Sequence, residues 1–186
     1  IEGDILQPLA IRSMEKAYYT SKKVGHFGLA FDYYAHFTSP IRRYPDLITH
    51  RMLYDYLTKS KSFNYNEVEK LAKHCSEQEQ KAVSAERAST KYKQVEYLSN
   101  FTNEEFEGII SGVTDWGIYV EIIENKCEGM VRIRDIKGDH YSFYPEKKKV
   151  IGQRTKNSYG LGQRVWIKVK GTDINKRTID FELIAQ

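Results

Sequence analysis

Hydrophobic residues follow two different spacings along the chain, and the change falls close to Asn103. Up to that point they recur at intervals of three and four residues, which is the spacing of an amphipathic helix. The pattern predicts a helix from Ser39 to about Thr58 and a longer one from about Glu67 to Asn100. A shorter helix is expected from Asp4 to Ala17. Residues 1–103 are therefore expected to form a helical domain.

After Asn103, hydrophobic and polar residues alternate, which is typical of half-buried β-strands. Short strands are predicted at 106–113, 117–123, 129–133, 164–170 and 178–183. Five short strands suit a small barrel, because closure removes the exposed edges of a sheet. The segment 136–162 interrupts this series and is rich in Lys, Tyr and Gly. We expect it to be a loop segment with a functional role.

Composition permits nucleic-acid binding without requiring it. The 186 residues are 40% hydrophobic and 29% charged, with a mean hydropathy of −0.61 and a net charge of +4. Such a small charge excludes a polycationic module, so RNA would have to bind through local basic clusters and aromatic stacking. No apolar run approaches the roughly 20 residues that span a bilayer, so no membrane partner is expected. Cys75 and Cys127 lack metal-ligand spacing and indicate a reducing compartment, most simply the cytoplasm.

The richest local chemistry lies between residues 34 and 46, in the sequence YAHFTSPIRRYPD. Ser39 is a suitable helix cap, and the proline after it suits the first helical position. A helix beginning there would point its free N–H groups and the positive end of its dipole outward. Arg42 and Arg43 add two guanidinium groups that can bind phosphate. The simpler alternative is that both arginines are solvated or paired with Asp46.

The residues around this stretch resemble a known family. The runs HFGLA at 26–30 and YAHFTSPIRRYPDL at 34–47, with the pair His50-Arg51, resemble the end of the catalytic RNB domain in the ribonuclease R branch of the ribonuclease II family. The resemblance implies a processive 3′-to-5′ exoribonuclease that hydrolyses single-stranded RNA to nucleoside 5′-monophosphates. It also implies that residues 1–103 are the C-terminal helical part of such a domain.

Residues 104–186 resemble the S1-type OB fold, an RNA-binding β-barrel. The matching features are Gly108, Gly112-Val113, Trp116-Gly117, Tyr119-Val120, the run from Glu128 to Val131, His140-Tyr141, Leu161-Gly162 and Ile179-Asp180-Phe181. Their position after the arginine segment is also the order of domains in the ribonuclease R branch. The expected fold class is therefore α+β, with the helical end of an RNB catalytic domain followed by a five-stranded OB-fold barrel.

In the helical part, the resemblance implies that Arg42 lies beside the scissile phosphate. A guanidinium there can hold the negative charge that develops in the transition state. Further contacts to RNA are expected from His36, Thr38, Ser39, Arg43, Tyr44 and Glu86. Two alternatives stay open at this point. Arg43 could contact only Asp46, and Glu86 could be an ordinary solvated residue of the long helix.

In the barrel, Trp116 and Tyr119 are expected on an open face where RNA bases can stack. Such contacts are worth roughly 1–3 kcal/mol per base and tolerate any base. The alternative is that the two rings pack against their own barrel. The remaining candidates for RNA contact in this part are Arg132, Arg134, His140 and Tyr141.

The chain shows no aspartate cluster before Arg42, since the aspartates nearby are scattered at Asp4, Asp32, Asp46 and Asp55. The resemblance implies that Mg²⁺, held by clustered aspartates earlier in the polypeptide, serves catalysis in the full-length enzyme. We therefore expect no metal ligands and no catalysis in this chain alone, and an N-terminal part of the same polypeptide as its partner. A chain that starts at Ile1 fits that expectation. The alternative from another class is a non-catalytic protein that binds single-stranded RNA or acts as an adaptor.

Overall fold

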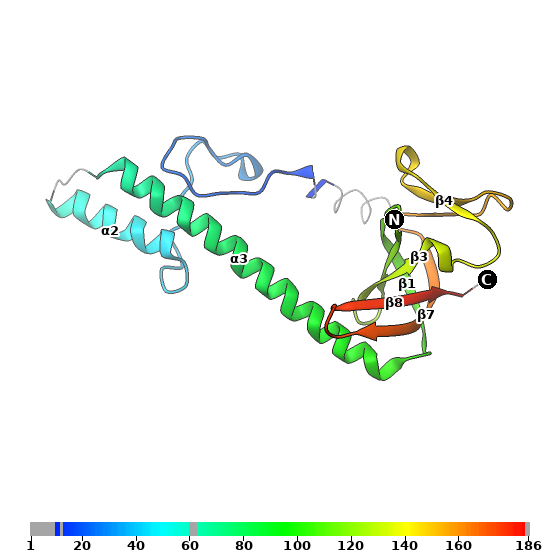
Figure 1. Ribbon diagram of the computed structural model, residues 1–186. Helices are drawn as coiled ribbons and strands as arrows, with labels where there is room; N and C mark the ends of the chain where they lie inside the picture. Colours follow the sequence, from blue (N-terminus) through cyan, green and yellow to red (C-terminus); the bar gives the residue numbers. More distant parts are fainter. Residues whose placement is uncertain (1–9, 12, 60–62, 185–186) are drawn as a thin grey trace. The chain divides into compact units, whose positions relative to one another are not determined.

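The computed structural model describes residues 10–11, 13–59 and 63–184 (Figure 1). The chain divides into two compact units, Glu15–Glu86 and a second unit that contains Arg87–Gln186. This division falls inside the long helix α3, and the domain boundary expected at Asn103 stays a prediction. In the described part of the chain, no helix is both long enough and apolar enough to cross a membrane. Short 3₁₀ turns lie at Phe27–Leu29 (η1), Ser99–Phe101 (η2), Ile133–Asp135 (η3) and Pro145–Lys147 (η4).

The helical unit contains α2 (Tyr44–Lys59) and most of α3 (Tyr65–Leu98). The long helix agrees with its prediction to within two residues at each end. The start of α2 at Ser39 was wrong by five residues. The carbonyl of Ser39 accepts hydrogen bonds from the N–H groups of Arg42 (3.2 Å) and Arg43 (3.0 Å), which closes a separate turn before the helix. The first turn of α2 instead contains Pro45, where the missing N–H has no helical partner to lose.

The helix expected from Asp4 to Ala17 lies mainly outside the described residues. Its described end is not helical, because the chain from Glu15 to Thr20 has no regular structure. Side chains of α3 hold the segment that follows. Ser76 Oγ accepts a hydrogen bond from the Tyr19 N–H (2.9 Å), and the Glu69 carboxylate accepts from the backbone N–H and the hydroxyl of Ser21 (both 2.6 Å). These long-range hydrogen bonds fix residues 19–21 against α3.

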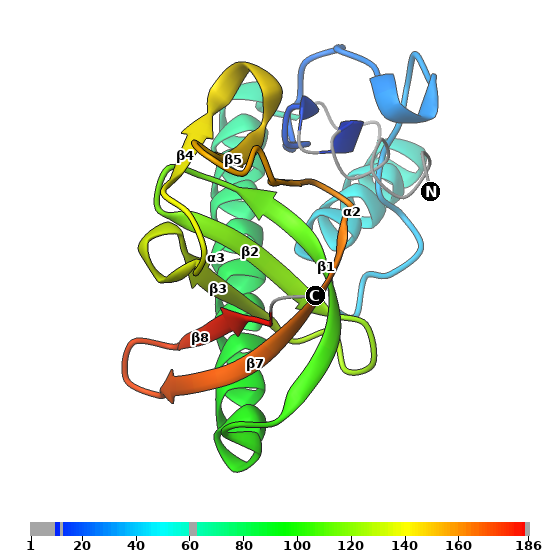
Figure 2. The same cartoon turned by 90° about the vertical axis from the view of Figure 1, so that its right-hand side faces the viewer.

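The second unit is built around a closed barrel in which the strands follow the order β1-β2-β3-β8-β7 (Figure 2). The strands are β1 (Glu105–Val113), β2 (Gly117–Ile122), β3 (Glu128–Arg132), β7 (Arg164–Asp173) and β8 (Thr178–Leu183). Neighbours are antiparallel except β3 and β8, which run parallel with Met130 opposite Asp180. The five predicted strands and the OB-fold barrel are confirmed.

The last turn of α3 contributes to the core of the barrel. Val95 and Leu98 are fully buried, in one hydrophobic cluster with the inward-facing residues of the strands. Close packing in this cluster requires glycine at position 129, because a Cβ there would lie 2.5 Å from Cε2 of Phe181. The end of α3 is therefore part of the barrel unit in packing as well as in chain order.

The segment expected to be a loop forms a second sheet instead, called here the added sheet. It contains β4 (Tyr141–Tyr144), β5 (Lys149–Gly152) and β6 (Ser158–Gly160), all antiparallel. Its turns place Lys148 and Lys156 at φ values of 48° and 61°. Glycine or Asn-Gly usually marks such turns, and a lysine at these positions does not predict a hairpin. Tyr141 and Val150 lie in the barrel's hydrophobic cluster, which holds the added sheet against the barrel.

Candidate nucleic-acid interface

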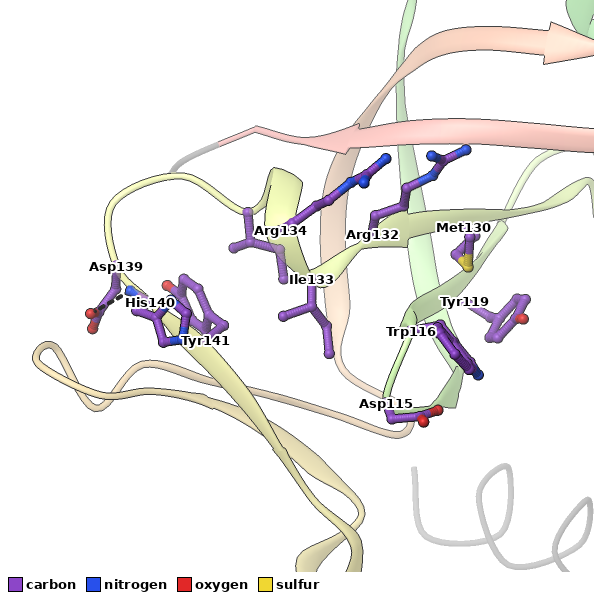
Figure 3. A pocket seen from close by; sticks show the side chains of 11 residues that line it. Asp115, Trp116, Tyr119, Met130, Arg132, Ile133, Arg134, Asp139, His140 and Tyr141 are labelled. Atoms are coloured by element: carbon purple, nitrogen blue, oxygen red, sulfur yellow. Dashed lines mark hydrogen bonds between the residues drawn. The ribbon is translucent and has the colours of Figure 1, made fainter.

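A pocket of about 650 Å³ opens on the barrel unit beside β2 and β3 (Figure 3). Its lining residues are Asp115, Trp116, Tyr119, Met130, Arg132, Ile133, Arg134, Ile136, Asp139, His140 and Tyr141. These lining residues include all six barrel residues that were expected from the sequence to contact RNA. The fold therefore brings together residues from the β1–β2 turn, from β2 and β3, and from the start of the added sheet.

Trp116 and Tyr119 provide the flat surfaces of the pocket. Trp116 lies in the turn between β1 and β2 and is 73% exposed, so the barrel core does not use its ring. Tyr119 lies on β2 opposite Gly112 of β1, and its side chain lines the same pocket. Both rings lie on the same side of the barrel (Figure 3), where they can receive bases.

Two arginines supply positive charge at the pocket rim, and they differ in how firmly they are paired. Arg132 Nη2 lies 3.1 Å from Asp180 Oδ2, so its guanidinium is held by a carboxylate from β8. Arg134 is 74% exposed, with Nε 3.7 Å from Asp135 Oδ1. That carboxylate is bound more closely by Lys170, 2.8 Å away, whose hydrogen bond chiefly lowers the pKa of Asp135. Arg134 is therefore the more available cation for an incoming phosphate.

His140 and Tyr141 have different environments although they are adjacent. Tyr141 is only 6% exposed, and its ring centroid lies 5.6 Å from that of Tyr159 in the barrel cluster. Burial and the neighbouring Tyr141 raise the pKa of Tyr159 to about 12. The Tyr141 side chain is therefore a wall of the pocket and not an exposed stacking surface. His140 is exposed, and its backbone N–H donates to Asp139 Oδ1 at 2.7 Å (Figure 3).

Sequence reasoning missed several lining residues and the partner of Arg132. Met130 precedes Arg132 by two positions on β3, so strand alternation would have placed it on the same face. Asp180 lies opposite Met130 through the parallel pairing of β3 and β8. No local pattern in the sequence reveals that pairing, because the two strands are far apart in the chain.

In the helical unit, the anion held by Ser39 and Arg43 is the chain's own Asp46. This carboxylate is fully buried and accepts hydrogen bonds from the Ser39 N–H (2.7 Å) and from Arg43 Nη2 (2.9 Å). Burial opposes ionisation of Asp46, but these hydrogen bonds outweigh it and lower the pKa. Ser39 therefore does not cap α2, and its N–H is already in use. The pairing of Arg43 with Asp46 follows the simpler alternative considered from the sequence.

The other candidates of the helical unit differ in exposure. Arg42 is exposed, and its side chain forms no ion pair or hydrogen bond with a residue that the structure describes. Thr38 and Tyr44 are also exposed. His36 is half-buried, with Nδ1 2.8 Å from the hydroxyl oxygen of Tyr19. Burial and the nearby Glu79 carboxylate raise the pKa of that hydroxyl to about 12. The Arg42 guanidinium is thus exposed to solvent, whereas the His36 ring is hydrogen-bonded to Tyr19.

Glu86 and the carboxylates of the helical unit do not assemble into a metal centre. Glu86 is exposed on α3. Within residues 10–11, 13–59 and 63–184, no group of three or more His, Cys, Asp or Glu side chains could hold a metal ion. Asp46 is the buried carboxylate of this part, and its Oδ2 is engaged by Ser39 and Arg43. The described residues therefore do not fit a magnesium site.

Comparisons with known proteins match a different family model to each part of the chain. A family model for the RNB domain matches residues 2–59, and one for the S1 RNA binding domain matches residues 99–184. Ribonuclease R of Ureaplasma parvum serovar 3 is 40% identical over 189 residues, covering 98% of this chain. Two RNase R structures from Mycoplasma genitalium, the apo form and a complex with ribose methylated single-stranded RNA, match 97% of the chain with TM-scores of 0.89 and 33% identity. Over nearly its whole length, the chain is similar to part of ribonuclease R.

The chain spans about a quarter of the length of its ribonuclease R relatives. It covers 26% of the Ureaplasma protein and 29% of each Mycoplasma chain. The two family models lie along the chain in the order RNB then S1, as expected from its sequence. The helical unit and the barrel unit are therefore similar to consecutive parts of ribonuclease R.

Proposed function

We propose that the pocket face of the barrel binds single-stranded RNA. One observation chiefly supports this proposal. The six barrel residues expected to contact RNA all line one pocket, and the exposed Trp116 ring shares that pocket with two guanidinium groups. Bases stack on Trp116 and Tyr119, while Arg134 and Arg132 contact the phosphates. Stacking of this kind accepts any base, which suits an enzyme that must move along RNA of any sequence.

The parent protein is, in this proposal, a hydrolytic, processive 3′-to-5′ exoribonuclease that releases nucleoside 5′-monophosphates. Arg42 contacts the scissile phosphate and stabilises the charge that develops on its oxygens. Support comes from the contrast within the arginine pair. Arg43 is neutralised by Asp46, whereas Arg42 is exposed with no paired carboxylate among the described residues. Of the other candidates in this segment, the exposed Thr38 and Tyr44 contact the same stretch of RNA backbone.

The divalent metal that the ribonuclease R family implies, proposed here to be Mg²⁺, would be held by residues outside this chain. When bound, it would activate the attacking water and neutralise phosphate charge. This chain's own contribution is to bind the RNA and to position one phosphate at Arg42. We therefore propose that the chain acts in the cytoplasm, together with an N-terminal part of the same polypeptide, and that it does not cleave RNA alone.

Substitution of Arg42 in the full-length polypeptide tests the catalytic part of the proposal. Arg42→Ala should lower the single-turnover cleavage rate by a factor of about 100 to 1,000, as removal of one transition-state donor does elsewhere, with a smaller loss of RNA affinity. Arg42→Lys keeps the charge but loses the planar fork, so it should recover only part of the rate. Lys73→Ala, which removes an exposed cation from α3, is the control. Equal losses of affinity and rate would assign Arg42 to ground-state binding.

A further inference from the structure

The added sheet carries an excess of positive charge that the rest of the chain lacks. Residues 136–162 contain six basic and two acidic residues, a net charge of +4 that equals the net charge of the entire 186-residue chain. Five of the six basic residues lie in or beside the two turns of the sheet. The β4–β5 turn and the start of β5 carry Lys147, Lys148 and Lys149, and the β5–β6 turn carries Arg154 and Lys156.

The β5–β6 turn is fixed directly beside the RNA pocket. The carboxylate of Asp139, a lining residue, accepts hydrogen bonds from the N–H groups of Arg154 (2.9 Å) and Thr155 (2.6 Å) and from the Thr155 hydroxyl (2.7 Å). The Gln153 N–H donates to the carbonyl of His140, also a lining residue, at 2.9 Å. The hydrogen bonds from Thr155, together with those from the other N–H groups, lower the pKa of Asp139 to about 2. The anchor therefore stays charged at neutral pH.

The two cations of this turn are not neutralised within the described fold. Both side chains are exposed. Arg154 Nη2 donates to the carbonyl of Gly138 at 3.2 Å, which orients the guanidinium without cancelling its charge. No carboxylate of the described residues forms an ion pair with Arg154 or Lys156. Lys137 of the same segment differs, because it pairs with Glu182 on β8. The turn thus presents two unpaired positive charges next to His140, and one of them, the Arg154 guanidinium, is oriented by a hydrogen bond.

We propose that Arg154 and Lys156 form a second phosphate-binding element, which continues the RNA path from the pocket across His140. The inference rests on the proposed function, because the strand must first lie on Trp116 and Tyr119. An RNA chain is a better fit than an acidic peptide, since aromatic and imidazole rings precede the cations and offer surfaces for bases. A strand of a few nucleotides occupies the pocket alone, and a longer strand also reaches the turn.

The test compares two RNA lengths in the full chain. A double substitution, Arg154→Gln with Lys156→Gln, is titrated with a 4-nucleotide and a 12-nucleotide oligouridylate by fluorescence anisotropy over a range of salt concentrations. Each lost phosphate contact on a single strand reduces the slope of log K against log salt by about 0.7, so two lost contacts predict roughly 25-fold weaker binding of the 12-mer at 0.1 M salt. Binding of the 4-mer should not change.

The matched control removes the same charge elsewhere on the barrel unit. Lys93 and Lys126 lie in a separate groove beside the end of α3, and Lys93→Gln with Lys126→Gln should bind both RNAs as the wild type does. An unchanged 12-mer affinity and salt slope in the Arg154 and Lys156 variant would overturn the inference, as would an equal loss for both RNA lengths. Displacement of the 12-mer from the wild type by a 12-residue polyglutamate would assign the turn to acidic proteins. Failure of the wild type to bind either RNA would instead reject the proposed function itself.

Discussion

Substitution of the exposed Trp116 can distinguish a role of its ring in RNA binding from a role in folding. Because its side chain is 73% exposed, Trp116→Ala removes little buried surface and should leave the melting temperature almost unchanged. If one base stacks on the ring, the loss is roughly 1–3 kcal/mol. At about 1.4 kcal/mol for each tenfold change, the dissociation constant should rise roughly 5- to 150-fold. Adding Tyr119→Ala should weaken binding further, because that ring faces the same pocket.

The assay is a fluorescence anisotropy titration of a 12-nucleotide oligouridylate with the full chain at 0.1 M salt. The matched control is Trp166→Ala on β7, because Trp166 is also exposed (43%) but does not line the pocket. It should bind RNA as the wild type does. Equal affinity in the Trp116 variant and the wild type, or an equal loss in the Trp166 variant, would refute the stacking argument. A large drop in melting temperature on Trp116→Ala would show that the ring serves packing.

Three further predictions concern the fold that supports the pocket. Gly129→Ala places a methyl group against a core phenylalanine ring and should destabilise the barrel by about 1–3 kcal/mol in urea unfolding, whereas Gly171→Ala, with open space around it, should cost less. Leu98→Ala should cost about 2–5 kcal/mol in the same assay, because this helix residue is fully buried in the barrel core. The lowered pKa of Asp139 predicts that its anchoring contribution is complete above pH 4 and is lost as the pH falls through about 2. Amide exchange at Thr155 should therefore keep its protection factor from pH 4 to 8 and lose it in Asp139→Ala at any pH.

The barrel was predictable because its signals are local. Alternation of hydrophobic and polar residues located all five barrel strands, and the turn between β1 and β2 placed Trp116 and Tyr119 near one another. The added sheet was missed because its turns place Lys148 and Lys156 in the left-handed region. Lysine is not typical of such a conformation, so a loop was predicted for residues 136–162 in place of paired strands. Tyr141 and Val150 of this sheet pack in the hydrophobic cluster of the barrel.

The structure of the arginine segment, residues 34–46, could be predicted only in part from the sequence. A serine followed by proline is a typical helix start, and the spacing of the two arginines to Asp46 suited either a phosphate or an ion pair. The outcome was decided by burial. Once Asp46 is buried, its carboxylate needs hydrogen-bond donors, and the nearby Ser39 N–H and Arg43 both donate to its Oδ2. This pairing delays the helix start and leaves Arg42 as the exposed cation.

We propose that this chain binds RNA and that the metal site for cleavage is formed by residues outside it. The most direct test incubates the purified chain with 5′-labelled single-stranded RNA, with and without magnesium, and scores complex formation and RNA length in the same samples. We predict saturable binding in both conditions and intact RNA throughout. Magnesium-dependent shortening from the 3′ end would contradict the claim about the metal site, and absence of binding at 0.1 M salt would contradict the claim about RNA.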